Sequence, residues 1–196
     1  TASGNTSGEC AAGNGADTVM LSNGTYTLSR VGSGEDAAAA GDLDITQDLF
    51  LFGTNAADTI IDGGGIDRVL DIDPFGNGIL VSISSVTISG GDVTGNGGGV
   101  RNAASVFVLM ESHINANTAT SDGGGLYNTG SILLTDVTLS NTEAGSTGDG
   151  GAIKNTSGTA NLTRCALTGN DAGNDGGGID VSGSGTLTVA GSTLSG

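Results

Sequence analysis

Short apolar runs alternate with polar residues along almost the whole chain. In Phe107-Val108-Leu109 and Ile132-Leu133-Leu134 the runs contain β-branched or large apolar residues and are bounded by Ser, Asn, Asp and Gly. This period of two is typical of half-buried β-strands. No window shows a helical period of useful length. The pattern therefore predicts an all-β chain made of many short strands.

The predicted strands recur at a regular interval along the chain. An apolar residue directly after a glycine-rich turn returns about every 26 residues, and two further apolar segments follow each turn. The turns are Gly97-Gly98-Gly99-Val100, Gly123-Gly124-Gly125-Leu126, Gly150-Gly151-Ala152-Ile153 and Gly176-Gly177-Gly178-Ile179. Three strands per repeat, each pairing with its equivalent one repeat along, predict a right-handed parallel β-helix (β-solenoid) of about 7–8 coils, stacked about 4.8 Å apart.

We expect one domain over residues 1–196. The regular glycine-turn coils cover residues 91–196, and less regular coils of the same kind cover residues 18–90. Residues 1–17 are expected to form an N-terminal tail or entry segment. The chain length suits a single core.

Composition and charge restrict the partners. The chain has 38 glycines without a three-residue period and one proline, which excludes collagen. Its 21 acidic and 5 basic residues give a net charge of −16, so nucleic acid and anionic membranes are poor partners. No apolar stretch is long enough for a membrane span. The pattern requires no cofactor, and Ca²⁺ is the candidate ion.

Several segments together resemble a known group of proteins. They are Gly15-Ala16-Asp17-Thr18-Val19, Gly24-Thr25-Tyr26-Thr27-Leu28, Gly41-Asp42-Leu43-Asp44-Ile45, Thr59-Ile60-Ile61-Asp62-Gly63-Gly64, Asp67-Arg68-Val69 and the glycine turns. In this order they resemble secreted bacterial and archaeal β-helix repeat proteins of the choice-of-anchor, CSLREA-type group. The resemblance covers nearly the whole chain. It implies a pectin-lyase-like right-handed fold and an extracellular or cell-surface location, but no reaction.

The chain departs from that group at both ends. A short capping helix expected before Cys10 is absent, and the last segment stops inside a coil, so both ends look uncapped. Uncapped solenoid ends expose unpaired strand edges and apolar cross-sections. We therefore expect head-to-tail contacts with further copies. The expected N-terminal face is Val19, Leu21, Tyr26 and Leu28, and the C-terminal face is Ile179, Val181, Leu187, Val189 and Leu194.

The two cysteines, Cys10 and Cys165, do not form a metal-binding or redox pair by spacing. In a regular rod they lie several coils apart, too far for a bridge within one chain. Either Cys10 reaches Cys165 of a neighbouring subunit as an intersubunit disulfide, or Cys165 is a core residue in the place that Val137 takes one coil earlier.

Acidic residues precede the glycine turns at equivalent positions. Asp122, Asp149 and Asp175, with Asn96 before them, form a ladder in which neighbouring carboxylates would repel one another. Bound Ca²⁺ would relieve that repulsion. The alternative, which we favour, is that these residues shape the turns, as Asp and Asn commonly do.

A second ladder and two acid pairs have structural explanations. Asn102, Asn128 and Asn155 occupy equivalent positions, where stacked amides satisfy one another. The pairs Asp42/Asp44 and Asp71/Asp73, with Arg68 and Arg101 as candidate partners, could form a carboxylate-based catalytic site. We favour an ordinary solvated strand face for these acids, and so assign no catalytic residue. His113 is expected to be an exposed strand residue.

Four glycosylation sequons begin at Asn5, Asn23, Asn155 and Asn161. Because Asn155 belongs to the amide ladder, Asn5 and Asn23 are the better surface candidates.

The sequence favours a non-enzymatic extracellular structural protein, a β-solenoid that stacks head to tail with itself into a filament or surface fibre. The first alternative is a carbohydrate-binding or carbohydrate-cleaving β-helix, with glycans as partners. The second is a fragment of a longer surface adhesin. Self-association, polysaccharide binding and the length of the full chain distinguish the three.

Overall fold

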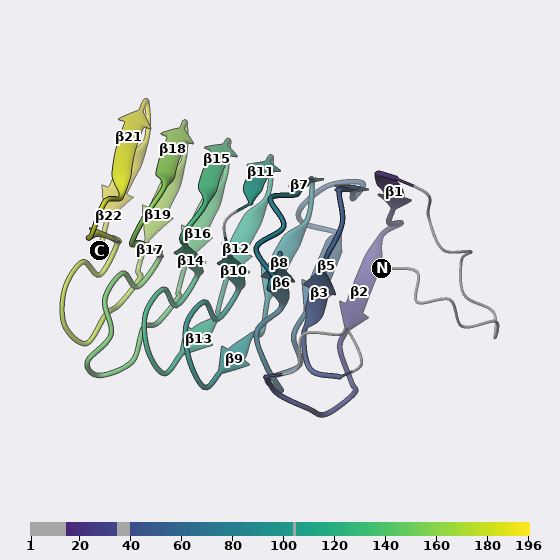
Figure 1. Ribbon diagram of the computed structural model, residues 1–196, viewed down its shortest axis with the longest axis horizontal. Coiled ribbons are helices and arrows are strands. Elements are labelled where there is room, and N and C mark those ends of the chain that lie inside the picture. The colour runs from purple at the N-terminus through teal and green to yellow at the C-terminus, as the bar shows by residue number, and fades with distance from the viewer. Residues whose placement is uncertain (1–14, 35–39, 104) are drawn as a thin grey trace.

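The protein is an all-β parallel solenoid. The computed structural model describes residues 15–34, 40–103 and 105–196, and these contain twenty-two strands and no helix. Each pass of the chain around the rod adds one strand to each of three parallel sheets. Figure 1 shows the passes stacked side by side along one axis, from the N-terminal end to the C-terminal end.

Strand order within each sheet follows the order of the turns. The first sheet comprises β1 (Asp17–Met20), β4 (Leu49–Phe52), β7 (Leu80–Ser84), β11 (Val106–Met110), β15 (Ser131–Thr135), β18 (Thr159–Thr163) and β21 (Thr186–Ala190). The second comprises β2 (Gly24–Thr27), β5 (Thr59–Asp62), β8 (Thr87–Ser89), β12 (His113–Asn115), β16 (Thr138–Ser140), β19 (Ala166–Thr168) and β22 (Thr193–Ser195).

Among the described residues, the third sheet has one strand fewer. It comprises β3 (Leu43–Ile45), β6 (Leu70–Ile72), β10 (Val100–Asn102), β14 (Leu126–Asn128), β17 (Ile153–Asn155) and β20 (Ile179–Val181). A small fourth ladder pairs β9 (Asp92–Val93) with β13 (Thr118–Ala119). Single bridges continue that ladder through Glu143 to Asp171.

The described residues make about six turns, and β21 and β22 begin the next. The early turns use more chain than the later ones. Asp17 pairs with Leu49, whereas Val106 pairs with Ser131. The register aligns Val100, Leu126, Ile153 and Ile179, the residues that follow the four glycine turns.

The core consists of apolar columns that run along the rod. Because strand residues alternate between faces, each strand sends every second side chain inward. One column of the first sheet contains Leu51, Ile83, Leu109, Leu134 and Leu162, all buried. One column of the second sheet contains Ile61, Ile88, Ile114, Leu139 and Leu167, also buried. These columns end at both tips of the rod.

Glycine is needed where the chain enters β10, β14, β17 and β20 of the third sheet. The first glycine of every turn adopts a positive φ, for example +67° at Gly123. A Cβ there would also lie 2.6 Å from the Leu126 carbonyl oxygen. Both the backbone conformation and the close approach therefore exclude larger residues.

Candidate functional site

The acidic ladder beside the glycine turns is a hydrogen-bonded structure between coils. Each side chain accepts a hydrogen bond from the backbone N–H of its successor one coil along. The distances are 3.1 Å from Asp122 to Asn96, 3.0 Å from Asp149 to Asp122 and 3.1 Å from Asp175 to Asp149. This geometry supports the turn-shaping interpretation. Calcium binding by Asp122, Asp149 and Asp175 stays a prediction.

Lys154 adds a cation that the sequence pattern did not single out. Its Nζ lies 2.7 Å from Asp149 Oδ2 and 2.6 Å from Asp180 Oδ2, and its side chain is almost fully buried. The hydrogen bond from Lys154 is the main reason that the pKa of Asp149 falls to about 2. Burial opposes the charge of Lys154, but the hydrogen bonds that it donates to both carboxylates raise its pKa above the ordinary value. One lysine thus joins two successive coils.

The acid pairs near the N-terminal end are buried, and the expectation of a solvated face is wrong. Asp42, Asp44 and Asp71 each offer a carboxylate oxygen, and these atoms lie within 4.8 Å of one another. Arg68 Nη1 donates to Asp42 Oδ2 at 3.0 Å and to Asp71 Oδ2 at 2.8 Å. Arg101 Nε donates to Asp71 Oδ1 at 2.9 Å. Arg68 and Arg101 are therefore partners of these acids, as predicted, but the acids are buried and not solvated.

Gly34, in the described part of the connection between β2 and β3, lies near the segment before β6, where its N–H donates to Asp67 Oδ2 at 3.3 Å. Among the described residues, the three carboxylates are the one group spaced to hold a metal ion. Two guanidinium groups already supply the positive charge that such an ion would bring. We assign the cluster a role in joining the first coils.

The pKa values of Asp42 and Asp73 are shifted in opposite directions. Loss of hydration raises the pKa of Asp42 to about 7, although the charge of Arg68 opposes the shift. Asp73 behaves in the opposite way. Burial alone would raise its pKa, but hydrogen bonds from the Asn77 and Gly78 N–H groups and from the Ser105 hydroxyl lower it. Asp73 thus has hydrogen-bond partners of its own, apart from the arginines that bind Asp71.

The cysteine and sequon predictions fall on different parts of the chain. Cys165 is buried, and its N–H donates to Ser192 Oγ at 2.9 Å, so it occupies the core position expected from Val137. Cys10 and Asn5 lie outside the described residues, and the intersubunit bridge stays a prediction. Asn23 is exposed, and its Oδ1 accepts a hydrogen bond from the Thr54 hydroxyl.

The amide ladder and His113 are placed as expected. Asn102 Nδ2 donates to Asn128 Oδ1, and Asn128 Nδ2 donates to Asn155 Oδ1, both at 2.7 Å. All three amides are buried, which removes Asn155 as a glycosylation site. His113 is exposed on β12.

The N-terminal end exposes the first residues of the core columns. Val19 and Tyr26 are each 37% exposed, although the residues after them in the same columns, Leu51 and Ile61, are buried. Leu21 and Leu28 follow the strands and are half-buried, and Leu21 packs against the core. β1 and β2 are also edge strands, whose outer hydrogen-bonding groups face away from the sheet.

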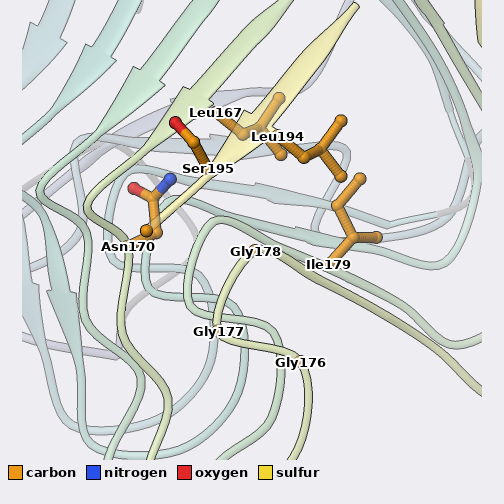
Figure 2. A pocket seen from close by; sticks show the side chains of 9 residues that line it. Leu167, Asn170, Gly176, Gly177, Gly178, Ile179, Leu194 and Ser195 are labelled. Atoms are coloured by element: carbon orange, nitrogen blue, oxygen red, sulfur yellow. The ribbon is translucent and has the colours of Figure 1, made fainter.

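The C-terminal end exposes the last residues of the same columns. Val189 is 41% and Leu194 49% exposed, and Leu187 and Val181 are exposed to a similar degree. Ile179 is half-buried. A hollow of about 310 Å³ opens here. Figure 2 shows Leu167, Ile179 and Leu194 around it, with the chain from Gly176 to Gly178 passing below.

Both predicted end faces are therefore apolar, and each consists of open core columns. Val19 and Val189 end one column, and Tyr26 and Leu194 end another. Such a surface can take one more β-coil by strand pairing and apolar packing, since both are what each coil already does for the next.

Comparisons with protein families, with curated proteins and with solved structures find no match for this chain. The resemblance to the choice-of-anchor, CSLREA-type group thus extends, on present observations, to a parallel β-solenoid fold and stays a prediction beyond it. Within the described ranges, no helix has the length and apolarity to cross a membrane.

Proposed function

We propose that this chain is a non-enzymatic structural subunit that stacks head to tail with further copies. The observation that carries the proposal is the match between its two ends, which leave the same core columns open. Stacking would continue Val189 of one copy with Val19 of the next, and Leu194 with Tyr26. The exposed edges of β21 and β22 would gain β1 and β2 as partners.

This contact joins two different surfaces. A head-to-tail contact is heterologous and leaves a free head and a free tail after every addition. Copies related along the rod axis would therefore form an open filament. At about 4.8 Å per coil, seven coil positions per subunit correspond to an axial repeat of about 34 Å.

Charge opposes the assembly. Each subunit carries a net charge of −16, so approaching copies repel one another in dilute salt. At about 0.15 M salt the screening length falls to about 8 Å, which leaves mainly the short-range contacts at the junction. Assembly should therefore strengthen as ionic strength rises.

The setting that we propose is extracellular or at the cell surface, as a fibre. Support comes from the low lysine content and the many Ser, Thr, Asn and Gly residues. The exposed Asn23 offers a surface position for glycan attachment. A carbohydrate-cleaving β-helix is less well supported, because the best acid cluster, around Asp42 and Asp71, is buried.

Electron microscopy and sedimentation velocity of the purified chain, across a salt series, test the proposal. We expect filaments with the repeat given above. Val189→Asp should abolish them without changing the thermal stability of the monomer, since this side chain is already exposed. Thr188→Asp is the matched control, because the neighbouring residue faces outward on the same strand.

A chain that stays monomeric at every salt concentration would contradict the proposal. So would equal effects of Val189→Asp and Thr188→Asp, because only the inward column is open at the junction. A monodisperse monomer that binds acidic polysaccharide would instead favour the carbohydrate-binding alternative.

A further inference from the structure

Among the described residues, the outer face of the first sheet carries no charged side chain. Residues alternate along each strand, so Val108 points outward next to the buried Leu109. The outward positions of the seven strands hold only apolar, Ser, Thr and Asn residues. The outer face of the second sheet differs, because Asp62 and His113 lie on it. In a chain with 21 acidic residues and a net charge of −16, this side of the rod is therefore unusual.

The N-terminal part of this face is apolar. Val106 and Leu133 are 41% and 40% exposed, and Val108 and Met110 are half-buried. The apolar outward residues on the earlier strands are Met20, Phe50, Phe52 and Leu80. From β18 onward, the outward positions hold Thr, Asn and Ala. Contiguous exposed apolar surface of this kind is typical of sites at which proteins interact.

The two edges of this face differ in charge. Glu111 and Asp136 directly follow β11 and β15, and both are exposed. At the same levels of the rod, Ser105 and Gly130 precede these strands on the other edge. Arg164, one coil further along, forms an ion pair with Asp136. The edge after the strands is therefore the charged one, and Glu111 lies on it next to the middle strand of the sheet.

Two kinds of half-turn could bring this face of one copy onto the same face of another. If the axis runs parallel to the strands through β11, Glu111 meets Glu111 of the second copy, and the apolar strands meet the Thr-rich ones. If the axis runs along the rod, each strand meets its own counterpart, and Glu111 lies on the side of Ser105. Like charges that face each other in an interface cost free energy. The axis along the rod is therefore favoured.

We propose that the outer face of the first sheet binds the same face of a second copy, with the two rods side by side and their N-terminal ends at the same level. Such a contact is isologous. With the axis over the middle of each strand, Val108 faces Val108 of the second copy, and Val106 faces Met110. Sheets that pack face to face lie about 10 Å apart. The inference goes beyond head-to-tail stacking, because it concerns the side of the rod and does not need the ends.

A second rod matches this face in charge and in period. Each chain carries a net charge of −16, so two copies repel least where both surfaces are uncharged. The coils of both rods repeat at about 4.8 Å, so every strand level finds the same level opposite. In stacked filaments the match would continue over each subunit. A second copy therefore suits the face along its whole length.

The area of the face determines how strongly two rods pair. Strands of up to five residues at about 3.3 Å per residue, and seven strands at about 4.8 Å, give about 500 Å² per copy. Two such faces bury about 1,000 Å², near the lower limit for specific protein pairs. Two single rods should thus pair weakly. In filaments the contact repeats with every subunit, so the pairing should become much stronger.

A charge swap at Val108 tests the pairing apart from stacking. The background is Val189→Asp, which should block the head-to-tail contact, and sedimentation equilibrium measures dimerisation. Val108→Lys alone and Val108→Asp alone should each lower the dimerisation constant at least about tenfold, because like charges then face each other across the axis. An equimolar mixture of the two should restore the dimer. Thr138→Lys and Thr138→Asp, on the outer face of the second sheet, are the matched controls and should change dimerisation little.

The outcomes separate this inference from the stacking proposal. A Val189→Asp chain that stays monomeric at every concentration would contradict the inference, and filaments of the parent chain would still support stacking. If the mixture of Val108 variants does not restore the dimer, Val108 does not face itself and the arrangement is wrong. Dimers of Val189→Asp without any filaments of the parent chain would remove the stacking proposal and leave this inference intact.

Electron microscopy of the filaments gives an independent measurement. The parent chain should form double filaments, and Val108→Asp should convert them to single filaments with an unchanged axial repeat. Thr188→Asp, in the same outward row, should also narrow the filaments without abolishing them. Single filaments in the parent chain would contradict the inference, as would double filaments that persist in Val108→Asp.

Discussion

At the scale of single residues, several positions where a coil turns have a backbone conformation that is rare for residues with a side chain. The position after β8, β12, β16 and β19 of the second sheet adopts a left-handed conformation, with φ of +69° at Gly90 and +61° at Gly169. Ala116 and Asn141 occupy the same position with φ of +53°. A side chain with a Cβ costs roughly 1–2 kcal/mol in this region. Ala116 therefore carries strain that two equivalent positions avoid.

Ala116→Gly should consequently stabilise the fold. We expect a gain of about 1 kcal/mol in the free energy of unfolding, measured by urea denaturation of the unassembled chain. Ala166→Gly is the control, because this strand residue has an ordinary backbone conformation and should lose stability on the same substitution. A loss of stability in Ala116→Gly would contradict the argument.

The buried Asp42 carboxyl should make the first coils sensitive to pH. Its pKa in the folded chain is about 7, against an ordinary value of 3.8. Ionisation is therefore penalised in the folded state, and stability present below pH 4 is lost as the pH rises toward 7. The slope is at most about 1.4 kcal/mol per pH unit.

Asp42→Asn isolates this contribution, because it removes the charge and leaves Arg68 paired with Asp71. We expect the variant to gain stability relative to the parent chain between pH 4 and pH 8, as followed by thermal unfolding at each pH. The acids with lowered pKa, Asp73 and Asp149, are common to both chains and cancel in the difference. A pH-independent difference would show that Asp42 titrates normally.

At the scale of elements, the third sheet is joined by polar ladders on both faces. Inside, the amides of Asn102, Asn128 and Asn155 bond in series. Outside, Lys154 and Arg101 join carboxylates of neighbouring strands. Parallel strands place identical positions next to one another, so a side chain that can both donate and accept suits an inward column. Val181 ends the column where no further amide follows.

The effects of substitutions in the amide ladder on the free energy of unfolding should not be additive. Asn128→Ala leaves Asn102 and Asn155 without their partner in a dry core, and should cost about 2–4 kcal/mol in urea denaturation. Replacing all three by valine, the residue already present at Val181, should recover most of that loss. The Ser105 and Gly130 carbonyls also accept backbone N–H groups, so they stay bonded. Additive costs would contradict this account.

At the scale of the whole molecule, the rod has a protected middle and two open ends. Each coil contacts only its neighbours, so a central coil gains two interfaces and an end coil gains one. In the unassembled chain, hydrogen exchange should be slowest in β10–β12 and fastest in β1, β2, β21 and β22. Assembly should then protect the end strands selectively. Uniform protection along the rod would contradict both the linear organisation and the proposed junction.

Much of the fold could be predicted from the sequence, because each coil repeats the same constraints. Val100, Leu126, Ile153 and Ile179 follow glycine turns at nearly constant spacing, and the structure pairs them in one column. The burial of Cys165 could be predicted from the same register. The early turns were harder, since the connections after β2 and β6 are long and follow no repeat.

The acid cluster shows the limit of the pattern. Asp42 and Asp44 alternate as residues of a solvated strand would, but both are buried, and the cluster that they form with Asp71 is paired with two arginines supplied by other turns. Lys154 was missed for the same reason, because its partners Asp149 and Asp180 lie in the turn before it and in the next coil. Ion pairs between residues of different coils leave no signal in the local sequence pattern.

The sequence by itself determined the strand period, the glycine turns and the columns that form the core, because these repeat with every coil and depend on neighbours at fixed spacing. Only the tertiary structure decided which polar residues are buried, which charges pair and where the columns stay open. Those properties depend on how many strands each sheet contains and on which connections cover its faces. The third sheet, one strand short among the described residues, is the clearest example.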